Sequence, residues 1–405
     1  MEIARGTGKE THRSARLSLN HAKGKDKGMK VLIVSTSEST GGGAIAAMRL
    51  KDALNKHGVR AKMLVRDRQT DSDTVTQTGN ILPKAFERLA IMPWCGLSLQ
   101  RSWLVDTAWL GVDITGTRDF RDADVIHLHW VNQGMLSLSE LERILHCGKR
   151  VVWTLHDEWP FRGVCHYSGN CTSVGCQTCP LMRGSSPASI LARKMRLYAS
   201  HRITFVGCSQ WMADLARRAM PNADVRCAPN CIPHDIFKPI PRLEARNRLG
   251  LPQDRQVIMF CSQRLDDKRK GMDYLDKALG HFPQAIALRV GKGGRQTCDP
   301  REMAALYSAA DVFVSPSLQD NLPNTIAEAM SCGTPCVGFD TGGIPEMIRH
   351  MHTGYVARTC DAADLAKGIN HVLAHDMRQA AYQYAAATYD ETSVAEQYIS
   401  IYESR

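Results

Sequence analysis

The chain of 405 residues lacks several features that would mark a membrane-spanning, secreted or NAD-dependent protein. No run of about 18 apolar residues occurs, so a membrane-spanning helix is not expected. The first residues contain no apolar core of the kind that secretory signal peptides carry. No G-x-G-x-x-G pattern follows a predicted strand, which argues against a dinucleotide-dependent enzyme. With 43% hydrophobic and 23% charged residues the composition is globular, and the length predicts two domains.

Positive charge is concentrated at the start of the chain. The formal net charge is +10, and residues 1–28 hold seven Lys and Arg against three Asp and Glu, with almost no apolar periodicity. We therefore predict a disordered basic extension over residues 1–28 and a first domain that begins at Met29. The remaining chain is only mildly basic, so no nucleic-acid partner is expected.

Strands and helices are predicted to alternate through the first half of the chain. Apolar strands are expected at 31–36, 61–65, 125–128 and 151–155, with helical segments between them. This is the βαβ pattern of a doubly wound α/β sheet. Gly41-Gly42-Gly43 follows the first strand and precedes a predicted helix. Such a loop lets backbone N–H groups approach a phosphate or sugar, although a plain turn needs glycine too.

Three histidines lie at the ends of two predicted strands. His127 and His129 fall in the segment DVIHLHW and share one side of a strand, because side chains alternate along it. His156 follows the strand at 151–155. A histidine at a strand end is often only packed, but two such ends near one site favour function, since histidine titrates near neutrality and can bond hydroxyl groups. Both interpretations stay open.

A cysteine cluster occupies residues 165–179. It consists of Cys165, His166, Cys171, Cys176 and Cys179, with a C-x-x-C pair at its end. The spacing is typical of zinc ligands. Without a secretory signal we expect a reducing compartment, which disfavours disulfides. A structural zinc site is the favoured interpretation, with disulfides and unliganded thiols as alternatives.

Residues 311–346 are the most informative stretch. A strand at 311–315 leads through a loop to a helix at 324–331, with Pro323 predicted at its first position and Gly333 as a left-handed stop. The helix N-terminus at Asn324-Thr325 offers N–H groups to a phosphate. Glu328 could accept two hydrogen bonds from a ribose, and Asp320 could hold the hydroxyls of a group attached to the phosphates.

A basic segment follows another predicted strand, at 257–261. Arg264 and Lys270 leave its carboxyl end within the sequence RLDDKRKG. A run of charges is usually a solvated loop, but at this edge of a parallel sheet the two cations could neutralise a diphosphate.

These patterns together resemble the retaining glycosyltransferases of family 4, which have the GT-B fold. Asp320 and Glu328 match the family's acid-x7-acid signature, with Asp in place of the usual first Glu and Asn321-Leu322-Pro323 after it. Arg264 and Lys270 match its R-x5-K-G pattern. The family also has a glycine loop like Gly42-Gly43, where acceptor and donor diphosphate meet, and a histidine near acceptor and donor sugar that His129 matches best.

The resemblance implies two Rossmann-like domains that face each other across a nucleotide-sugar cleft. The first, residues 29–230, would bind the acceptor and contain the cysteine-rich insertion. The second, 231–388, would bind the nucleotide sugar, and residues 389–405 would form a helix that packs back on the first domain. His129, Asp320, Arg264 and Lys270 would act in catalysis. Gly42, Gly43, Arg264, Lys270, Asn324, Thr325 and Glu328 would contact the donor.

The implied reaction moves a sugar from a nucleotide diphosphate sugar to a hydroxyl of a glycan or lipid-linked glycan, with retention of configuration and without a metal cofactor. It would serve surface polysaccharide biosynthesis in the cytoplasm or at the inner face of the membrane. A GT-B nucleotide-sugar epimerase and an inactive zinc-stabilised binding protein are the alternatives. Residues 81–110 mix Lys84, Arg88 and Arg101 with three tryptophans, which suits either contact with anionic headgroups or a helix pair that covers the sheet.

Overall fold

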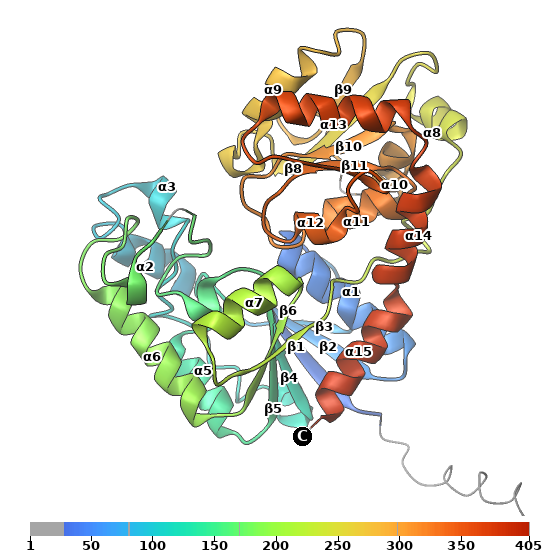
Figure 1. Cartoon of the computed structure of the whole chain (residues 1–405). Helices are drawn as coiled ribbons and strands as arrows, with labels where there is room; N and C mark the ends of the chain where they lie inside the picture. Colours follow the sequence, from blue (N-terminus) through green and yellow to red (C-terminus); the bar gives the residue numbers. More distant parts are fainter. Residues whose placement is uncertain (1–27, 80–81, 170, 298, 405) are drawn as a thin grey trace, which may run out of the picture.

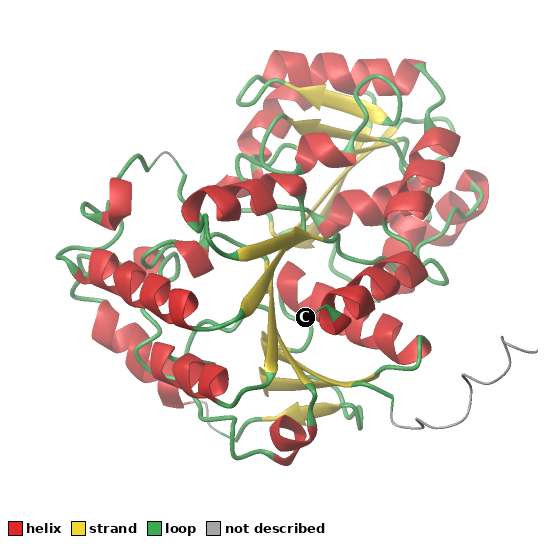
Figure 2. Ribbon diagram, turned by 60° about the horizontal axis from the view of Figure 1, so that its bottom comes forward, coloured by secondary structure: helices red, strands yellow, loops and turns green. Residues whose placement is uncertain are grey.

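The computed structural model describes residues 28–404 except 80–81, 170 and 298. The predicted basic extension, apart from its last residue, lies outside this range. The described chain forms two lobes, each built on a parallel sheet with helices on both faces (Figures 1 and 2). Sheets of this kind are buried on both sides, which explains why their strands are nearly continuous apolar runs.

The first lobe contains a seven-stranded parallel sheet in the order β3-β2-β1-β4-β5-β6-β7. Its strands are β1 (Lys30–Ser37), β2 (Arg60–Asp67), β3 (Val75–Gln77), β4 (Val125–Leu128), β5 (Arg150–Leu155), β6 (Ile203–Gly207) and β7 (Asp224–Cys227). Its helices are α1 (Gly42–Lys56), α2 (Leu82–Ile91), α3 (Leu99–Ser102), α4 (Arg118–Asp122), α5 (Leu138–His146), α6 (Ser186–Ser200) and α7 (Gln210–Ala219), with 3₁₀ turns η1 (Trp159–Phe161) and η2 (Val174–Cys176).

The second lobe contains a five-stranded parallel sheet in the order β12-β11-β10-β8-β9. Its strands are β8 (Val257–Arg264), β9 (Ile286–Lys292), β10 (Val312–Ser315), β11 (Cys336–Phe339) and β12 (Gly354–Ala357). Its helices are α8 (Arg242–Leu249), α9 (Met272–Leu279), α10 (Pro300–Ala309), α11 (Asn324–Ser331), α12 (Ile344–Met347), α13 (Ala362–Ala374) and α14 (Arg378–Thr388), with the 3₁₀ turn η3 (Lys268–Lys270).

Helix α11 has the predicted bounds, with one correction at its start. Pro323 is the N-cap residue, in extended backbone, and the helix proper begins at Asn324. Proline suits either position because neither requires its missing N–H. Gly333 has φ 73°, the left-handed conformation predicted for the residue that stops the helix.

The last helix, α15 (Glu391–Glu403), returns to the first lobe and lies along α1 (Figure 1). Its Val394, Tyr398 and Tyr402 join the core cluster formed by β1, β2 and α1. Tyr402 OH lies 2.8 Å from His127 Nδ1, and Thr154 Oγ1 lies 2.8 Å from the other ring nitrogen. The prediction of a GT-B architecture with a returning C-terminal helix is thereby confirmed.

None of the helices among the described residues is long and apolar enough to cross a bilayer.

Candidate active site

The glycine loop of the first lobe lies against the N-terminus of α11 in the second. Asn324, the first residue of α11, donates through Nδ2 to the Gly42 carbonyl oxygen at 3.0 Å, and its Oδ1 accepts from Asn230 Nδ2 at 2.9 Å. A Cβ added at Gly43 would lie 3.1 Å from the His156 ring of the same lobe, a tight contact that glycine avoids. The structure therefore brings two predicted regions, the glycine loop and the start of α11, into one place.

Asp320 and Lys270 form the second element of the site. Lys270 Nζ lies 2.5 Å from Asp320 Oδ2, and Arg269 Nη1 lies 3.9 Å from the same oxygen. Burial alone would raise the pKa of Asp320, but the charges of Lys270 and Arg269 outweigh it, so this pKa lies below its usual range. The carboxylate is thus held ionised beside two cations. Arg269 was not predicted from the sequence.

Glu328 is held between the two lobes. Its Oε1 accepts from Arg49 Nη2 at 2.7 Å and its Oε2 from the Tyr307 hydroxyl at 2.8 Å. Arg49 belongs to α1 in the first lobe, and both charged side chains are only 9% exposed. Both carboxylate oxygens of Glu328 are therefore hydrogen-bonded by protein groups. Thr325, one turn earlier on α11, is half-buried. Sequence reasoning missed Arg49 and Tyr307.

Arg264 is not brought to the other predicted site residues. Its guanidinium forms a two-pronged ion pair with Asp266 at 2.9 and 2.7 Å, and its side chain is 64% exposed. Arg264 is the last residue of β8, and Asp266 lies in the turn between β8 and η3. Lys270 faces Asp320, so the described contacts of the two cations are separate, and their shared role at a diphosphate stays a prediction.

Buried histidines lie beside the glycine loop. His129 Nδ1 lies 2.8 Å from His156 Nε2, and the rings of His127 and His129 are 4.3 Å apart. Burial, with the neighbouring imidazoles, lowers the pKa of His129 well below its usual value, so the ring is neutral. Its Nε2 is buried and has no hydrogen-bond partner among the described residues. His127, bonded to Tyr402, has a packing role.

The start of the cysteine-rich segment also reaches the second lobe. Arg269 stacks over the Tyr167 ring at 4.9 Å, and His166 Nδ1 lies 2.8 Å from Asp157 Oδ2. His166 Nε2 is buried without a partner in the part of the chain that the structure describes. Asp157 and His166 were not predicted as a pair, because only the folded loop brings them together.

The four cysteines predicted to bind zinc do not surround a common point. Cys165 is buried and Cys171, Cys176 and Cys179 are half-buried thiols. Among residues 28–404, with the gaps given above, no three His, Cys, Asp or Glu side chains are grouped to hold a metal ion. Burial raises the pKa of the Cys165 thiol to about 12. As placed, these side chains do not fit zinc, and the site stays a prediction.

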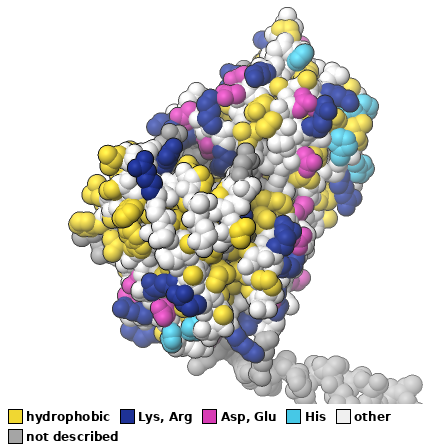
Figure 3. Space-filling view, turned by 60° about the vertical axis from the view of Figure 1, so that its left-hand side comes forward, with side chains coloured by type: hydrophobic (Ala, Val, Ile, Leu, Met, Phe, Trp, Pro, Cys, Tyr) yellow, Lys and Arg dark blue, Asp and Glu magenta, His cyan; other side chains and the backbone are white. Residues whose placement is uncertain are grey.

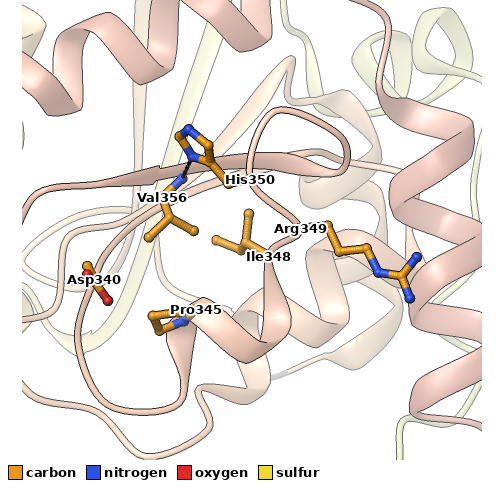
Figure 4. A pocket seen from close by; sticks show the side chains of 6 residues that line it. All are labelled: Asp340, Pro345, Ile348, Arg349, His350 and Val356. Atoms are coloured by element: carbon orange, nitrogen blue, oxygen red, sulfur yellow. Dashed lines mark hydrogen bonds between the residues drawn. The ribbon is translucent and has the colours of Figure 1, made fainter.

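A pocket of about 440 Å³ lies elsewhere in the second lobe (Figure 4). It is lined by Asp340, Pro345, Ile348, Arg349, His350 and Val356. The backbone N–H of Val356 donates to His350 Nδ1 at 3.1 Å across it. None of the predicted site residues lines this pocket, so it is separate from the site between the lobes.

Two family models of glycosyltransferases match this chain. A family model described as "Glycosyltransferase Family 4" matches residues 40–236, and one described as "Glycosyl transferases group 1" matches 255–375. The chain belongs to these glycosyltransferases. Each model matches one lobe. The first covers the glycine loop and the histidines, and the second covers Lys270, Asp320 and Glu328.

Curated relatives of this glycosyltransferase match over part of their length. D-inositol 3-phosphate glycosyltransferase of Xylanimonas cellulosilytica is 30% identical over 199 residues, which cover 41% of this chain and 47% of the relative. A protein of Escherichia coli K12 named "Putative colanic acid biosynthesis glycosyl transferase WcaC" is 27% identical over 255 residues, or 56% of this chain and 62% of the relative. The matched region thus spans about half to three-fifths of these relatives.

Solved structures share the fold of this glycosyltransferase over nearly its whole length. Sucrose-phosphate synthase from Thermosynechococcus elongatus superposes with a TM-score of 0.68 at 20% identity, covering 92% of this chain and 98% of that one. Anabaena HepE, solved in complex with UDP-glucose, has a TM-score of 0.64 at 17% identity, covering 92% and 99%. At these identities the likeness concerns the fold alone.

Proposed function

We propose that this protein transfers a sugar from a nucleotide diphosphate sugar to a hydroxyl group of a glycan or lipid-linked glycan, with retention of configuration. The observation that carries the proposal is the arrangement of Lys270, Asp320 and Glu328 around the N-terminus of α11, directly opposite the glycine loop. Cations, a helix N-terminus and two separate carboxylates suit a ligand with a diphosphate between two polyols. A role in surface polysaccharide biosynthesis is supported by the similarity to WcaC, which is named for colanic acid biosynthesis.

Each end of the donor has a counterpart in this arrangement. The N–H groups at Asn324 and Thr325, together with Lys270, would hold the diphosphate. Arg264 would join them by leaving Asp266, since its long exposed side chain is free to swing. Glu328 would bind the ribose hydroxyls in place of one of its present partners, Arg49 or Tyr307. Asp320 would bind hydroxyls of the transferred sugar.

The transfer step follows from retention. The bond between C1 of the sugar and the β-phosphate oxygen breaks, and the bond from the acceptor oxygen to C1 forms on the same face. The proton of the acceptor hydroxyl passes to the departing diphosphate, the nearest base on that face. Lys270 and the α11 N-terminus offset the developing negative charge. Because the pKa of His129 lies well below its usual value, its imidazole is a weak base and would hydrogen-bond a hydroxyl rather than remove its proton.

Binding and turnover test the proposal together. In a thermal-shift screen of UDP, GDP and ADP sugars, one donor at hundredfold excess over its Kd should stabilise the protein by about 2.7 kcal/mol. Lys270→Ala should then lower turnover about 100-fold or more. Lys268→Ala is the matched control, because this lysine of the same turn is exposed and pairs with Asp273.

Three substitutions separate the roles. Glu328→Ala should weaken nucleotide binding, whereas Asp320→Ala should reduce turnover more than nucleotide affinity. Equal activity of Lys270→Ala and wild type would contradict the diphosphate assignment. Conversion of the donor without any acceptor would identify an epimerase or hydrolase, and an inverted anomeric centre in the product would contradict retention.

A further inference from the structure

Helix α2 is inverted relative to an ordinary surface helix. Its Glu87 and Arg88 are buried, at 0% and 6% exposure, whereas Phe86 and Leu89 are 57% and 66% exposed. A helix at a water-covered surface normally turns apolar residues inward and charged residues outward. The outer face of α2 is therefore suited to an apolar neighbour and not to water.

A buried polar network fixes α2 in this orientation. Arg88 donates to the Val105 carbonyl oxygen at 2.9 Å and to the Asp106 carboxylate at 3.2 Å, and Thr107 Oγ1 donates to Glu87 at 2.9 Å. Rotation of the charged side outward would break these bonds within a low-dielectric interior. The sequence suggested Arg88 as a headgroup contact, and its burial corrects that suggestion.

The exposed apolar surface continues beyond α2. Of the large apolar side chains exposed in the described residues, all but Val174, Leu243 and Met351 lie between residues 86 and 110. Figure 3 shows hydrophobic side chains gathered on the part of the first lobe that contains α2 and α3, which protrudes at the left of Figure 1. Single exposed apolar residues are normal, but a contiguous group marks a contact surface.

Leu97 adds a second observation at this surface. Its φ is 57°, in the left-handed region that branched and bulky residues rarely adopt, and its side chain is 72% exposed. Asparagine or glycine would occupy this backbone with less strain. No buried contact of this side chain compensates the backbone strain, which indicates that the exposed leucine contacts a partner outside the folded chain.

The charge of this surface is positive. Between residues 85 and 110 the acids Glu87 and Asp106 are buried, and Arg101 is the exposed charged side chain among those described. Exposed Arg183 is added by a neighbouring loop, where its backbone N–H donates to the Trp94 carbonyl oxygen at 2.8 Å. Two cations therefore border the apolar side chains without an exposed acid from this segment.

We propose that this surface docks onto an anionic lipid bilayer. Its apolar members are Phe86, Leu89, Trp94, Leu97, Leu99 and Trp109. Half-exposed tryptophans suit the boundary between acyl chains and headgroups, and Arg101 and Arg183 suit anionic headgroups. A second copy of the chain fits less well, because a two-fold contact would bring the same cations of both copies together. The proposal stands independently of the sugar-transfer reaction.

Co-sedimentation with vesicles tests it on the full-length protein. Wild type should sediment with vesicles of phosphatidylcholine and phosphatidylglycerol in equal parts. Leu89→Gln with Leu97→Asn should lower the partition coefficient about 100-fold, about tenfold for each leucine. The melting temperature should not fall, since both side chains are exposed and Asn suits the left-handed backbone. Leu243→Gln, at an equally exposed leucine of α8, is the control and should bind like wild type.

The cations have a separate readout. Arg101→Gln with Arg183→Gln should lower binding to the anionic vesicles about tenfold and make the remaining binding insensitive to salt. Brominated lipids should quench the emission of wild type, since Trp94 and Trp109 are exposed while Trp153 and Trp159 are buried.

Several results would overturn the proposal. The proposal fails if the wild-type protein stays in the supernatant, or if it and the leucine variant sediment equally with the vesicles. It also fails if brominated lipids leave the tryptophan emission of the wild-type protein unquenched. A lipid-free dimer of wild type that dissociates in the leucine variant would instead assign the surface to a second copy of the chain.

Discussion

Replacing Arg49 by methionine removes one half of the ion pair that joins the two lobes at Glu328. The nitrogen and oxygen are 2.7 Å apart and both side chains are 9% exposed. At an effective dielectric constant of about 20, two unit charges at this distance attract each other by about 6 kcal/mol before desolvation is subtracted. A partner lost from a buried pair leaves an uncompensated charge, which typically costs about 3 to 5 kcal/mol.

We expect Arg49→Met to lower the free energy of unfolding by that amount, and a second substitution at Glu328 to restore most of it. Glu328→Gln added to Arg49→Met removes the unpaired charge and leaves an amide that Tyr307 can still hydrogen-bond. We therefore expect the double variant to regain most of the stability that Arg49→Met loses. The free energy of the first unfolding transition in urea, measured for wild type, both single variants and the double variant, gives the coupling energy.

An exposed ion pair of the same chain is the control. Arg217 and Asp214 on α7 are 2.8 Å apart but 43% and 46% exposed, so their coupling should be below about 1 kcal/mol. If the coupling between Arg49 and Glu328 is no larger than that of the control pair, the buried contact does not hold the lobes together and the reasoning is refuted.

Two further predictions concern buried ionisable groups. Burial, with the nearby Asp106 carboxylate, raises the pKa of Glu87 to about 7. Because the pKa of Glu87 is higher in the folded protein than in the unfolded chain, protonated Glu87 stabilises the fold at low pH, and this stabilisation is lost as the pH rises through about 7. Glutamine does not titrate, so the free energy of unfolding of Glu87→Gln relative to that of wild type should grow by roughly 2 kcal/mol from pH 5 to pH 8. A pH-independent difference would contradict this shift. If the cysteines of residues 165–179 bind zinc, elemental analysis of reduced protein should find about one zinc per chain, and chelation should lower its melting temperature; absence of zinc would end that prediction.

Much of the fold could be predicted because the interior strands carry their own signal. The strand predicted at 125–128 coincides with β4, and the one at 151–155 lies within β5, since both are apolar runs buried on two faces. The interior strand β6 was not predicted, although it is buried along its whole length. The edge strands β3 and β7 were not predicted either. They are three and four residues long and partly exposed, so they exist only through pairing with β2 and β6.

The site could be predicted only where its residues are close in sequence. Asp320 and Glu328 lie eight residues apart on one βα unit, so their spacing was visible. Arg49 meets Glu328 across 279 residues, and no local pattern announces such a contact. The inverted orientation of α2 was hidden for the same reason. Its own residues predict an apolar face turned inward, and the polar partners that reverse it, Asp106 and Thr107, come about twenty residues later.

The return of α15 to the first lobe has a consequence for synthesis on the ribosome. His127 on β4 obtains one of its two hydrogen bonds from Tyr402, which is 275 residues further along the chain. At about 5 to 20 residues per second, the ribosome needs about 15 to 55 s to add those residues. During that interval α1 covers this face of the first sheet without α15 beside it, and His127 lacks its partner Tyr402. The first lobe therefore completes its core after the second has been translated, so folding cannot proceed strictly one domain at a time.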